Sequence, residues 1–347
     1  KSMAHRRLAA LAAAITLGPQ AVEAASLVLP VDNLRTTFRE DPVTFAQQWP
    51  PPMLTSGKSP TIEEPTDVSL HSSRNDPWAS ILYPSEWEKS FDGARITALC
   101  REWWWLSYVA SSLYLVGLWA GTNAMRERKP FDLKSLLAAW NLFLAVFSFF
   151  GALRTLPHLF AMLQHGGFNY TLCRAALGGY GSGPTGLWVS LFIFSKYFEL
   201  IDTVFLVVRK KKVGFLHWYH HCSVLLYCWH AYVWEMPTGI YFVVMNYSVH
   251  AIMYFYYFLA AVCRQPPKWA LMVTIMQLVQ MAIGIIITLS HLHILFYSTV
   301  PNCDGHVPNL TAALGMYASY FILFAQFLFG RYCKKRDPKA HKLQEKL

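Results

Sequence analysis

The chain has 347 residues, of which 54% are hydrophobic and only 14% are charged, whereas soluble domains carry about 25% charged residues. This composition indicates a membrane protein and excludes an ordinary soluble domain. The net charge of +10 comes from basic residues in short clusters between apolar runs, which favours orientation in a membrane over nucleic-acid binding.

The first 92 residues differ in composition from the rest. Residues 1–26 combine a basic start with a short apolar run, a pattern typical of a signal or transit segment, although an unstructured tail explains it equally well. Residues 27–92 are rich in proline, serine and charge, so we expect a disordered extension, which the topology below places in the lumen.

Seven apolar runs follow, each long enough to cross a bilayer, which takes about 20 residues of helix. They cover residues 103–124, 136–161, 186–208, 214–234, 239–262, 270–297 and 311–332. We therefore predict an all-α, polytopic membrane protein with seven transmembrane helices over residues 93–333. A basic tail follows over residues 334–347.

Basic residues orient this predicted bundle. They gather in the loops after the first, third and fifth runs and in the tail, whereas Arg174 is the only lysine or arginine in the opposite loops. The positive-inside rule then places the C-terminus in the cytosol and the N-terminus in the lumen. Asn169 begins a glycosylation sequon on the lumenal side. Cys173 and Cys303 lie on that side too, either as a disulfide or as free thiols.

The third run contains charged residues that an apolar helix rarely carries. Lys196, Glu199, Asp202 and Thr203 fall within about 120° of helical arc. Each charge would cost roughly 2.5 to 3.5 kcal/mol at the bilayer centre. Because Lys196 and Glu199 are spaced to pair, the group is either a structural network or a set of contacts with substrate or with histidines.

The fourth run begins with histidines at i, i+3 and i+4, namely His217, His220 and His221. A helix turns about 100° per residue, so the three imidazoles share one face. Polar groups in membrane helices usually face the bundle interior. We predict a buried active site at these histidines, near the cytosolic side.

The fifth and sixth runs supply polar stripes that face the same interior. Asn246, His250 and Tyr254 follow one stripe of the fifth run. Gln277 and Gln280 lie on the sixth run, where hydrogen bonding between helices is the simpler role. His250 is a candidate partner of the three histidines.

Two other chemistries compete with this interpretation. Imidazole binds zinc and iron, and three histidines can hold zinc. Membrane di-iron enzymes carry several histidine boxes, whereas this chain has one HxxHH box and the single His250. We therefore predict no metal. A metal-dependent lipid oxidase or hydroxylase therefore stays an alternative, as does a seven-span transporter. Cys222 and Cys228 are poorly placed on the histidine helix to act as nucleophiles.

Four motifs occur together over about residues 95–335: Lys196-xx-Glu199-xx-Asp202-Thr203, His217-xx-His220-His221, Asn246-xxx-His250-xx-Met253-Tyr254 and Thr274-xx-Gln277-xx-Gln280. In this order they resemble the very-long-chain fatty acid elongase family, the membrane 3-ketoacyl-CoA synthases. Trp218 inside the histidine box is more similar to elongases of saturated and monounsaturated chains.

This resemblance implies an enzyme of the endoplasmic reticulum that condenses an acyl-CoA with malonyl-CoA, releasing CO2 and CoA without a cofactor. It also implies six helices around a narrow acyl tunnel, with the first helix outside, and other enzymes of the elongation cycle as partners.

Roles for individual residues follow by analogy with that family. His220 would take the acyl group and His250 would face it, while His217, His221 and Asn246 would orient the pair and donate hydrogen bonds to developing oxyanions. A cluster before the histidine helix either contacts the CoA phosphates or only enforces topology, namely Lys210, Lys211 and Lys212.

Overall fold

The computed structural model describes residues 83–297 and 299–333. Every regular element in these residues is helical, as the sequence predicts. The expected signal segment, most of the expected disordered extension and the basic tail lie outside the described residues.

Residues 83–92, expected to lack structure, include a short helix, α5 (Glu86–Lys89). Glu88 of this helix is 4% exposed and accepts hydrogen bonds from Arg154 at 3.0 Å and Trp188 at 2.9 Å. Burial raises the pKa of the Glu88 carboxyl, but the donors from Trp188, Arg154 and Ser85 outweigh it and lower that pKa to about 2. The buried carboxylate anchors residues 83–92 to the helices that carry Arg154 and Trp188. The polar composition of this segment gave no indication of that contact. Arg154 lies in the second apolar run, where its position is consistent with either a structural partner or an anion contact, and its bond to Glu88 is a structural one.

The remaining helices follow along the chain. They are α6 (Gly93–Glu102), α7 (Leu106–Ala124), α8 (Lys134–Cys173), α9 (Ala176–Gly179), α10 (Gly183–Phe198), α11 (Ile201–Val208), α12 (Phe215–Val233), α13 (Gly239–Val262), α14 (Ala270–Tyr297), α15 (Val307–Leu328) and the π-helix η3 (Phe329–Cys333).

Four helical segments are long and apolar enough to cross a membrane: α8, α13, α14 and Val307–Tyr332, which joins α15 to η3. The helices of the other three predicted runs are too short or not apolar enough to be included among these segments. The third divides at Glu199 and Leu200 into α10, of 16 residues, and α11, of 8 residues. The helices of the first and fourth runs, α7 and α12, have 19 residues each and carry many hydroxyl, indole or imidazole groups.

Helix α8 is longer than predicted, because it continues beyond residue 161 to Cys173. Gly167 interrupts it with φ of 75° and ψ of 175°. A residue with a Cβ rarely adopts this φ, whereas glycine does so at little cost. The polar Gln164 and His165 lie before this kink and end the apolar run, so the hydrophobic pattern did not predict the last turns of the helix.

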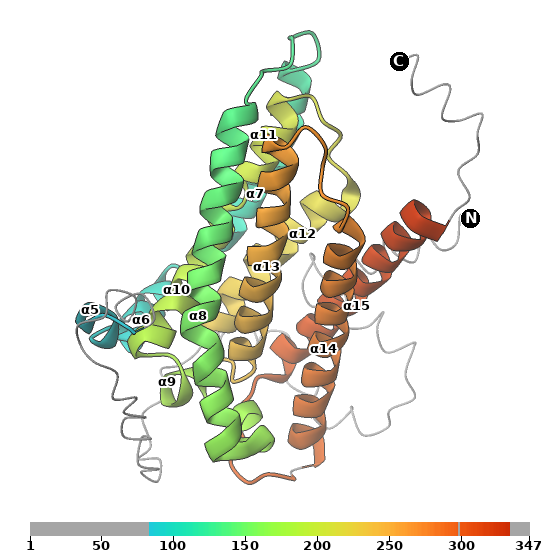
Figure 1. The fold of residues 1–347 in the computed structure, drawn as a ribbon. Helices are drawn as coiled ribbons and strands as arrows, with labels where there is room; N and C mark the ends of the chain where they lie inside the picture. Colours follow the sequence, from blue (N-terminus) through green and yellow to red (C-terminus); the bar gives the residue numbers. More distant parts are fainter. Residues whose placement is uncertain (1–82, 298, 334–347) are drawn as a thin grey trace. The chain divides into compact units, whose positions relative to one another are not determined.

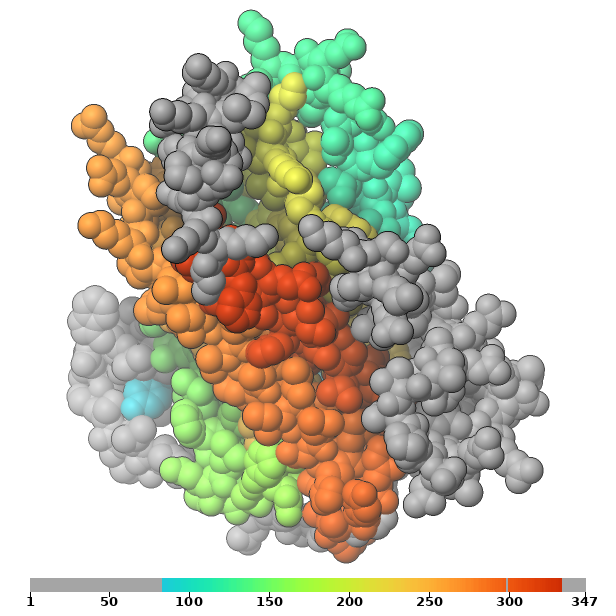
Figure 2. Space-filling model, turned by 90° about the vertical axis from the view of Figure 1, so that its right-hand side faces the viewer, coloured from blue at the N-terminus to red at the C-terminus, as the bar shows by residue number. Residues whose placement is uncertain are grey.

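The long helices pack side by side in a closed order (Figure 1). Helix α8 packs on α13, α13 on α14, α14 on α15, α15 on α12, α12 on α10, and α10 returns to α8. Figure 2 shows the C-terminal turns of α15, in red, lying against α14, in orange. Helix α7 packs on α11 and α12 from outside this order. The described part of the chain therefore forms a ring of helices with α7 on its outer side.

One end of the ring, which we call the disulfide end, is closed by a bond between Cys173 and Cys303, whose Cα atoms lie 4.4 Å apart. The structure thus pairs the two cysteines that the sequence placed on one side. Asp304 reinforces the contact, because its backbone N–H donates to the carbonyl of Cys173 at 2.9 Å. The opposite end, which we call the basic end, carries loops 125–133 and 209–214.

The candidate glycosylation site also lies near the disulfide end. Asn169 is exposed, but Thr171 of its sequon is fully buried and hydrogen-bonds to Tyr241 at 2.6 Å. Modification of Asn169 would therefore have to precede folding of this turn.

Candidate functional site

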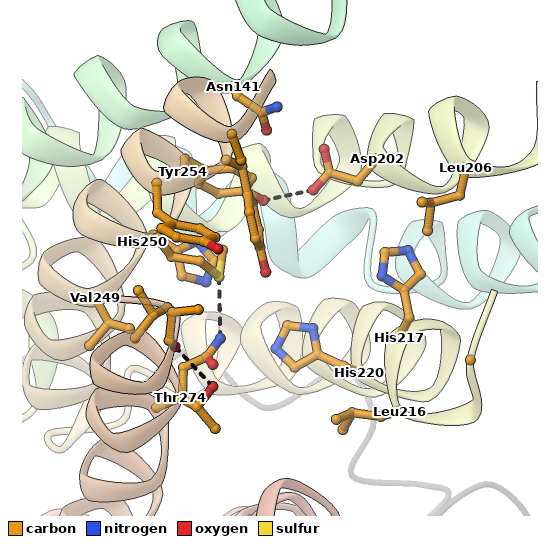
Figure 3. A pocket seen from close by; sticks show the side chains of 18 of the residues that line it. Asn141, Asp202, Leu206, Leu216, His217, His220, Val249, His250, Tyr254 and Thr274 are labelled. Carbon is orange, nitrogen blue, oxygen red and sulfur yellow. Dashed lines mark hydrogen bonds between the residues drawn. The ribbon is translucent and has the colours of Figure 1, made fainter. Parts of the chain in front are cut away.

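A cavity of about 850 Å³ extends from the basic end into the ring. Its lining comes from α8, α11, α12, α13, α14, α15 and η3. The charged side chains of Lys134, Arg209 and Arg331 lie on the lining where it meets the basic end. Deeper in, the lining changes to histidine, asparagine, glutamine and tyrosine (Figure 3).

Helix α12 presents its three histidines to this cavity. It begins after Gly214, and the i, i+3, i+4 spacing places His217, His220 and His221 along the lining. Figure 3 shows His217 and His220 rising from the helix next to each other. The rings of His217 and His221 are 4.4 Å apart, and the ring of His220 lies 5.1 Å from that of Tyr320.

Opposite them, His250 of α13 is held by a chain of hydrogen bonds that starts at Lys196. The Lys196 ammonium donates to Glu199 at 2.7 Å and to the side-chain oxygen of Asn246 at 3.1 Å. The amide nitrogen of Asn246 lies 3.1 Å from Nε2 of His250. All four side chains are at least nine-tenths buried. The sequence-predicted network and the fifth-run stripe therefore form one connected unit.

This chain fixes the proton on His250. An ammonium can only donate, so the atom of Asn246 facing Lys196 must be the oxygen. The amide nitrogen then faces His250 and donates to Nε2. A neutral imidazole that accepts at Nε2 carries its proton on Nδ1. His250 is therefore held as a hydrogen-bond donor at Nδ1.

A second network joins α8, α11 and α13. Asp202 accepts from the indole of Trp140 and from the hydroxyl of Tyr254, both at 2.7 Å. Figure 3 shows the bond from Tyr254. Sequence reasoning selected Asp202 and Tyr254 but missed Trp140, because an indole on an apolar helix carries no signal of a polar contact. These bonds hold α11 against α13 beside the histidines.

The glutamines of α14 take different positions. Gln277 donates to the sulfur of Met253 at 3.2 Å, which links α14 to α13 as predicted for hydrogen bonding between helices. Gln280 is 5% exposed and lies on the cavity lining. Thr274 hydrogen-bonds to its own helix at 3.3 Å.

The predicted lysine cluster does not lie on the cavity. Lys210, at φ of 54°, donates instead to the carbonyls of Arg126 and Arg128 at 2.8 and 3.1 Å, where it ties the two loops of the basic end together. Lys211 and Lys212 are exposed and absent from the lining. The cations that do line the cavity lie at the ends of apolar runs. Basic residues at such positions are expected for membrane topology alone, so the sequence did not single them out as binding residues.

The structure also places the residues that the alternative chemistries would use. Cys222 and Cys228 are absent from the lining. No three His, Cys, Asp or Glu side chains in the described ranges are arranged to hold a metal ion. A second sequence of the glycosylation type begins at Asn309 (Asn309-Leu-Thr311), but Asn309 is fully buried and bonded to Tyr227 and His230.

The fold and the site define a helical membrane protein with a deep, histidine-lined cavity that opens between basic side chains. Residues 99–340 match the ELO family (GNS1/SUR4 family), and the chain belongs to this family. It is 39% identical over 266 residues to very long chain fatty acid elongase 6 of Gallus gallus, covering 76% of this chain and 97% of the relative. It is 38% identical over 257 residues to the Homo sapiens protein of the same name, covering 73% and 94%. Fatty acid elongase 3 of Trypanosoma brucei brucei is 39% identical over 259 residues, covering 66% and 84%.

Proposed function

We propose that this protein is a fatty acid elongase that condenses a long-chain acyl-CoA with malonyl-CoA, giving a 3-ketoacyl-CoA, CO2 and CoA. Membership of the ELO family and the names of the relatives support the reaction class. The observation that carries the assignment to this site is the placement of His220 and His250, from different helices, on one cavity with cations near its entrance.

His220 is the nucleophile in this proposal. Its unprotonated ring nitrogen attacks the thioester carbonyl and the carbon–sulfur bond breaks. CoA leaves as the thiolate, which takes up the proton that the other ring nitrogen of His220 loses. Malonyl-CoA then loses CO2, and the enolate attacks the acyl-imidazole. The new carbon–carbon bond forms as the carbon–nitrogen bond to His220 breaks, and the departing imidazolate takes up a proton from water, which regenerates the imidazole.

His250 has a different role because Asn246 occupies its Nε2 atom. Its Nδ1–H can donate to the oxyanions that develop on the thioester and on the enolate. His217 and His221 complete the polar wall beside His220. Lys196, Glu199, Asp202 and Tyr254 act on this site through the bonds that hold His250 and α13 in place.

The same proposal gives the protein its place in the cell. The helices α7, α10 with α11, and α12 cross the bilayer together with the four longer segments, which makes seven spans. Six of them surround an acyl tunnel, and α7 lies outside. The basic end faces the cytosol, where CoA is found, and the disulfide end faces the oxidising lumen of the endoplasmic reticulum. Asn169 is then on the lumenal side. Other enzymes of the elongation cycle would take up the 3-ketoacyl product.

The cations at the cavity entrance are expected to bind the phosphates of CoA. Replacing Arg209 and Arg331 together by glutamine should raise KM for acyl-CoA and malonyl-CoA by about a hundredfold or more with little change in kcat, because bonds to charged groups contribute about 1.5 to 3 kcal/mol each. Steady-state kinetics at two salt concentrations measures this. The matched control is replacement of Lys211 and Lys212 by glutamine, which removes the same charge outside the cavity. An equal rise in KM for both double variants would contradict the assignment.

The reaction itself is tested by incubating the purified full chain with malonyl-CoA labelled at C2 and with saturated, monounsaturated and polyunsaturated acyl-CoAs in turn. Label should appear in a 3-ketoacyl-CoA two carbons longer than the primer, with one CO2 released per turnover. The saturated and monounsaturated primers should react best. Absence of product with every primer would overturn the proposal, and bound iron or zinc in the same preparation would favour the metal-dependent oxidase.

A further inference from the structure

A hydrogen-bond chain connects the outer helix α7 to the histidines inside the ring. The hydroxyl of Tyr114 lies 2.9 Å from that of Thr203, and the Thr203 hydroxyl lies 2.8 Å from Nε2 of His217. Thr203 is 3% exposed and Tyr114 is half-buried. Tyr114 belongs to none of the sequence motifs that singled out the other residues of the site.

We propose that Tyr114 is a positioning residue that fixes, through Thr203, the ring orientation and the proton position of His217. This inference rests on the proposed elongase function for its kinetic consequence. It assigns to α7, which packs outside the ring, a direct part in arranging the site.

The direction of the chain follows from counting hydrogens. If Tyr114 donates to Thr203 and Thr203 donates to Nε2 of His217, each hydroxyl hydrogen has an acceptor. If the chain runs the other way, from His217 through Thr203 to Tyr114, the phenolic hydrogen has no acceptor within the chain. The Tyr114 hydroxyl lies between the packed helices α7 and α11, where a donor left without an acceptor is costly, so the first direction is favoured.

The direction determines what His217 offers to the cavity. Because Nε2 accepts, the proton of the neutral ring lies on Nδ1, as it does in His250. Figure 3 shows His217 rising from α12 toward α11, the helix that carries Thr203. The ring is also in contact with His221, at 4.4 Å between centroids, so a change in its orientation would disturb the next histidine.

Removing the phenolic hydroxyl releases this constraint without opening a cavity. In a Tyr114→Phe variant, Thr203 can either donate to His217 or accept from it, so both proton positions become populated. Thr203→Val removes the chain entirely, whereas Thr203→Ser keeps the hydroxyl. The matched control is Tyr108→Phe, because Tyr108 lies on the same helix and is 49% exposed.

The kinetic test compares these variants as full-length proteins. Tyr114→Phe should lower kcat about tenfold, the effect of one hydrogen bond, with KM for both CoA substrates within about twofold. Tyr108→Phe should keep the wild-type kcat, and Thr203→Ser, which retains the hydroxyl, should restore most of the kcat that Thr203→Val loses. The double variant Tyr114→Phe with Thr203→Val should be no slower than Thr203→Val alone, since both changes break one chain. Wild-type kcat in Tyr114→Phe, or effects that multiply in the double variant, would overturn the proposal.

A spectroscopic readout separates this inference from the proposed function. Solid-state NMR of the protein labelled with ¹⁵N-histidine, in lipid nanodiscs, reports which ring nitrogen carries the proton. The His217 signal is assigned by its loss in a His217→Gln variant. The wild type should show the Nδ1–H form at His217, and Tyr114→Phe should show a mixture. A wild-type signal unchanged by Tyr114→Phe would contradict the positioning role even if the protein elongates acyl chains, and the expected mixture would support it even if no elongation is found.

Discussion

His220→Ala is expected to abolish condensation while the protein remains folded. The variant lacks the nitrogen that forms the acyl-imidazole in the proposed mechanism, and loss of a nucleophile of this kind lowers kcat by about 10⁴-fold or more. His220 is half-buried beside Tyr320, and its side chain is not part of any of the ion pairs among the described residues. The substitution should therefore lower the stability of the protein only a little. Incorporation of labelled malonyl-CoA into product measures the activity, and thermal unfolding measures the stability.

The covalent step is tested separately by withholding malonyl-CoA. Wild-type protein incubated with acyl-CoA alone should gain the mass of one acyl group and release one CoA, as seen by intact-protein mass spectrometry. His220→Ala should do neither, whereas His250→Ala should still acquire the acyl group, more slowly. His293→Ala is the matched control, because His293 is exposed near the disulfide end. Acylation of His220→Ala at the wild-type rate would reject His220 as the nucleophile.

Helical periodicity was sufficient to bring the principal site residues together. Residues at i, i+3 and i+4 share a face in any α-helix, so the common orientation of His217, His220 and His221 required no tertiary information. Burying an unpaired charge in a membrane helix is costly, and this cost predicted that Lys196 and Glu199 would pair. Their side chains do so at 2.7 Å. The resemblance to the elongase family rested on these same motifs, and the ELO family match agrees with it.

Residues whose role depends on packing between helices were not predictable in this way. Tyr114 and Trp140 sit on apolar helices, where an aromatic ring is equally consistent with a lipid-facing position. Only the approach of α11 gives each of them a polar partner. Lys210 illustrates the opposite case, because a basic residue beside a helix suggests a phosphate contact, whereas in this structure its side chain donates to the carbonyl of Arg126 in a neighbouring loop.

Lys196→Met is expected to be destabilising and inactive. The substitution leaves the Glu199 carboxylate, in a residue that is 4% exposed, without its cation, and breaking a buried ion pair from one side costs about 3 to 5 kcal/mol. Adding Glu199→Gln removes the uncompensated charge, so the double variant should recover most of this stability. Thermal unfolding of both variants in detergent, against wild type, measures the loss and the recovery.

Activity should not recover with stability in the Lys196→Met, Glu199→Gln double variant. Without the ammonium, nothing holds the oxygen of Asn246 away from His250, so the amide can turn and accept from Nε2–H. The proton then leaves Nδ1, and the donor aimed at the developing oxyanion is lost, which should lower kcat by about 10² to 10³-fold. The matched control neutralises the ion pair of Arg101 with Glu235, 3.0 Å apart and remote from the cavity lining, through Arg101→Met with Glu235→Gln. That variant, which likewise leaves no uncompensated charge, should keep kcat and most of its stability. A stable Lys196→Met, Glu199→Gln protein with wild-type kcat would remove Lys196 from the chain that orients His250.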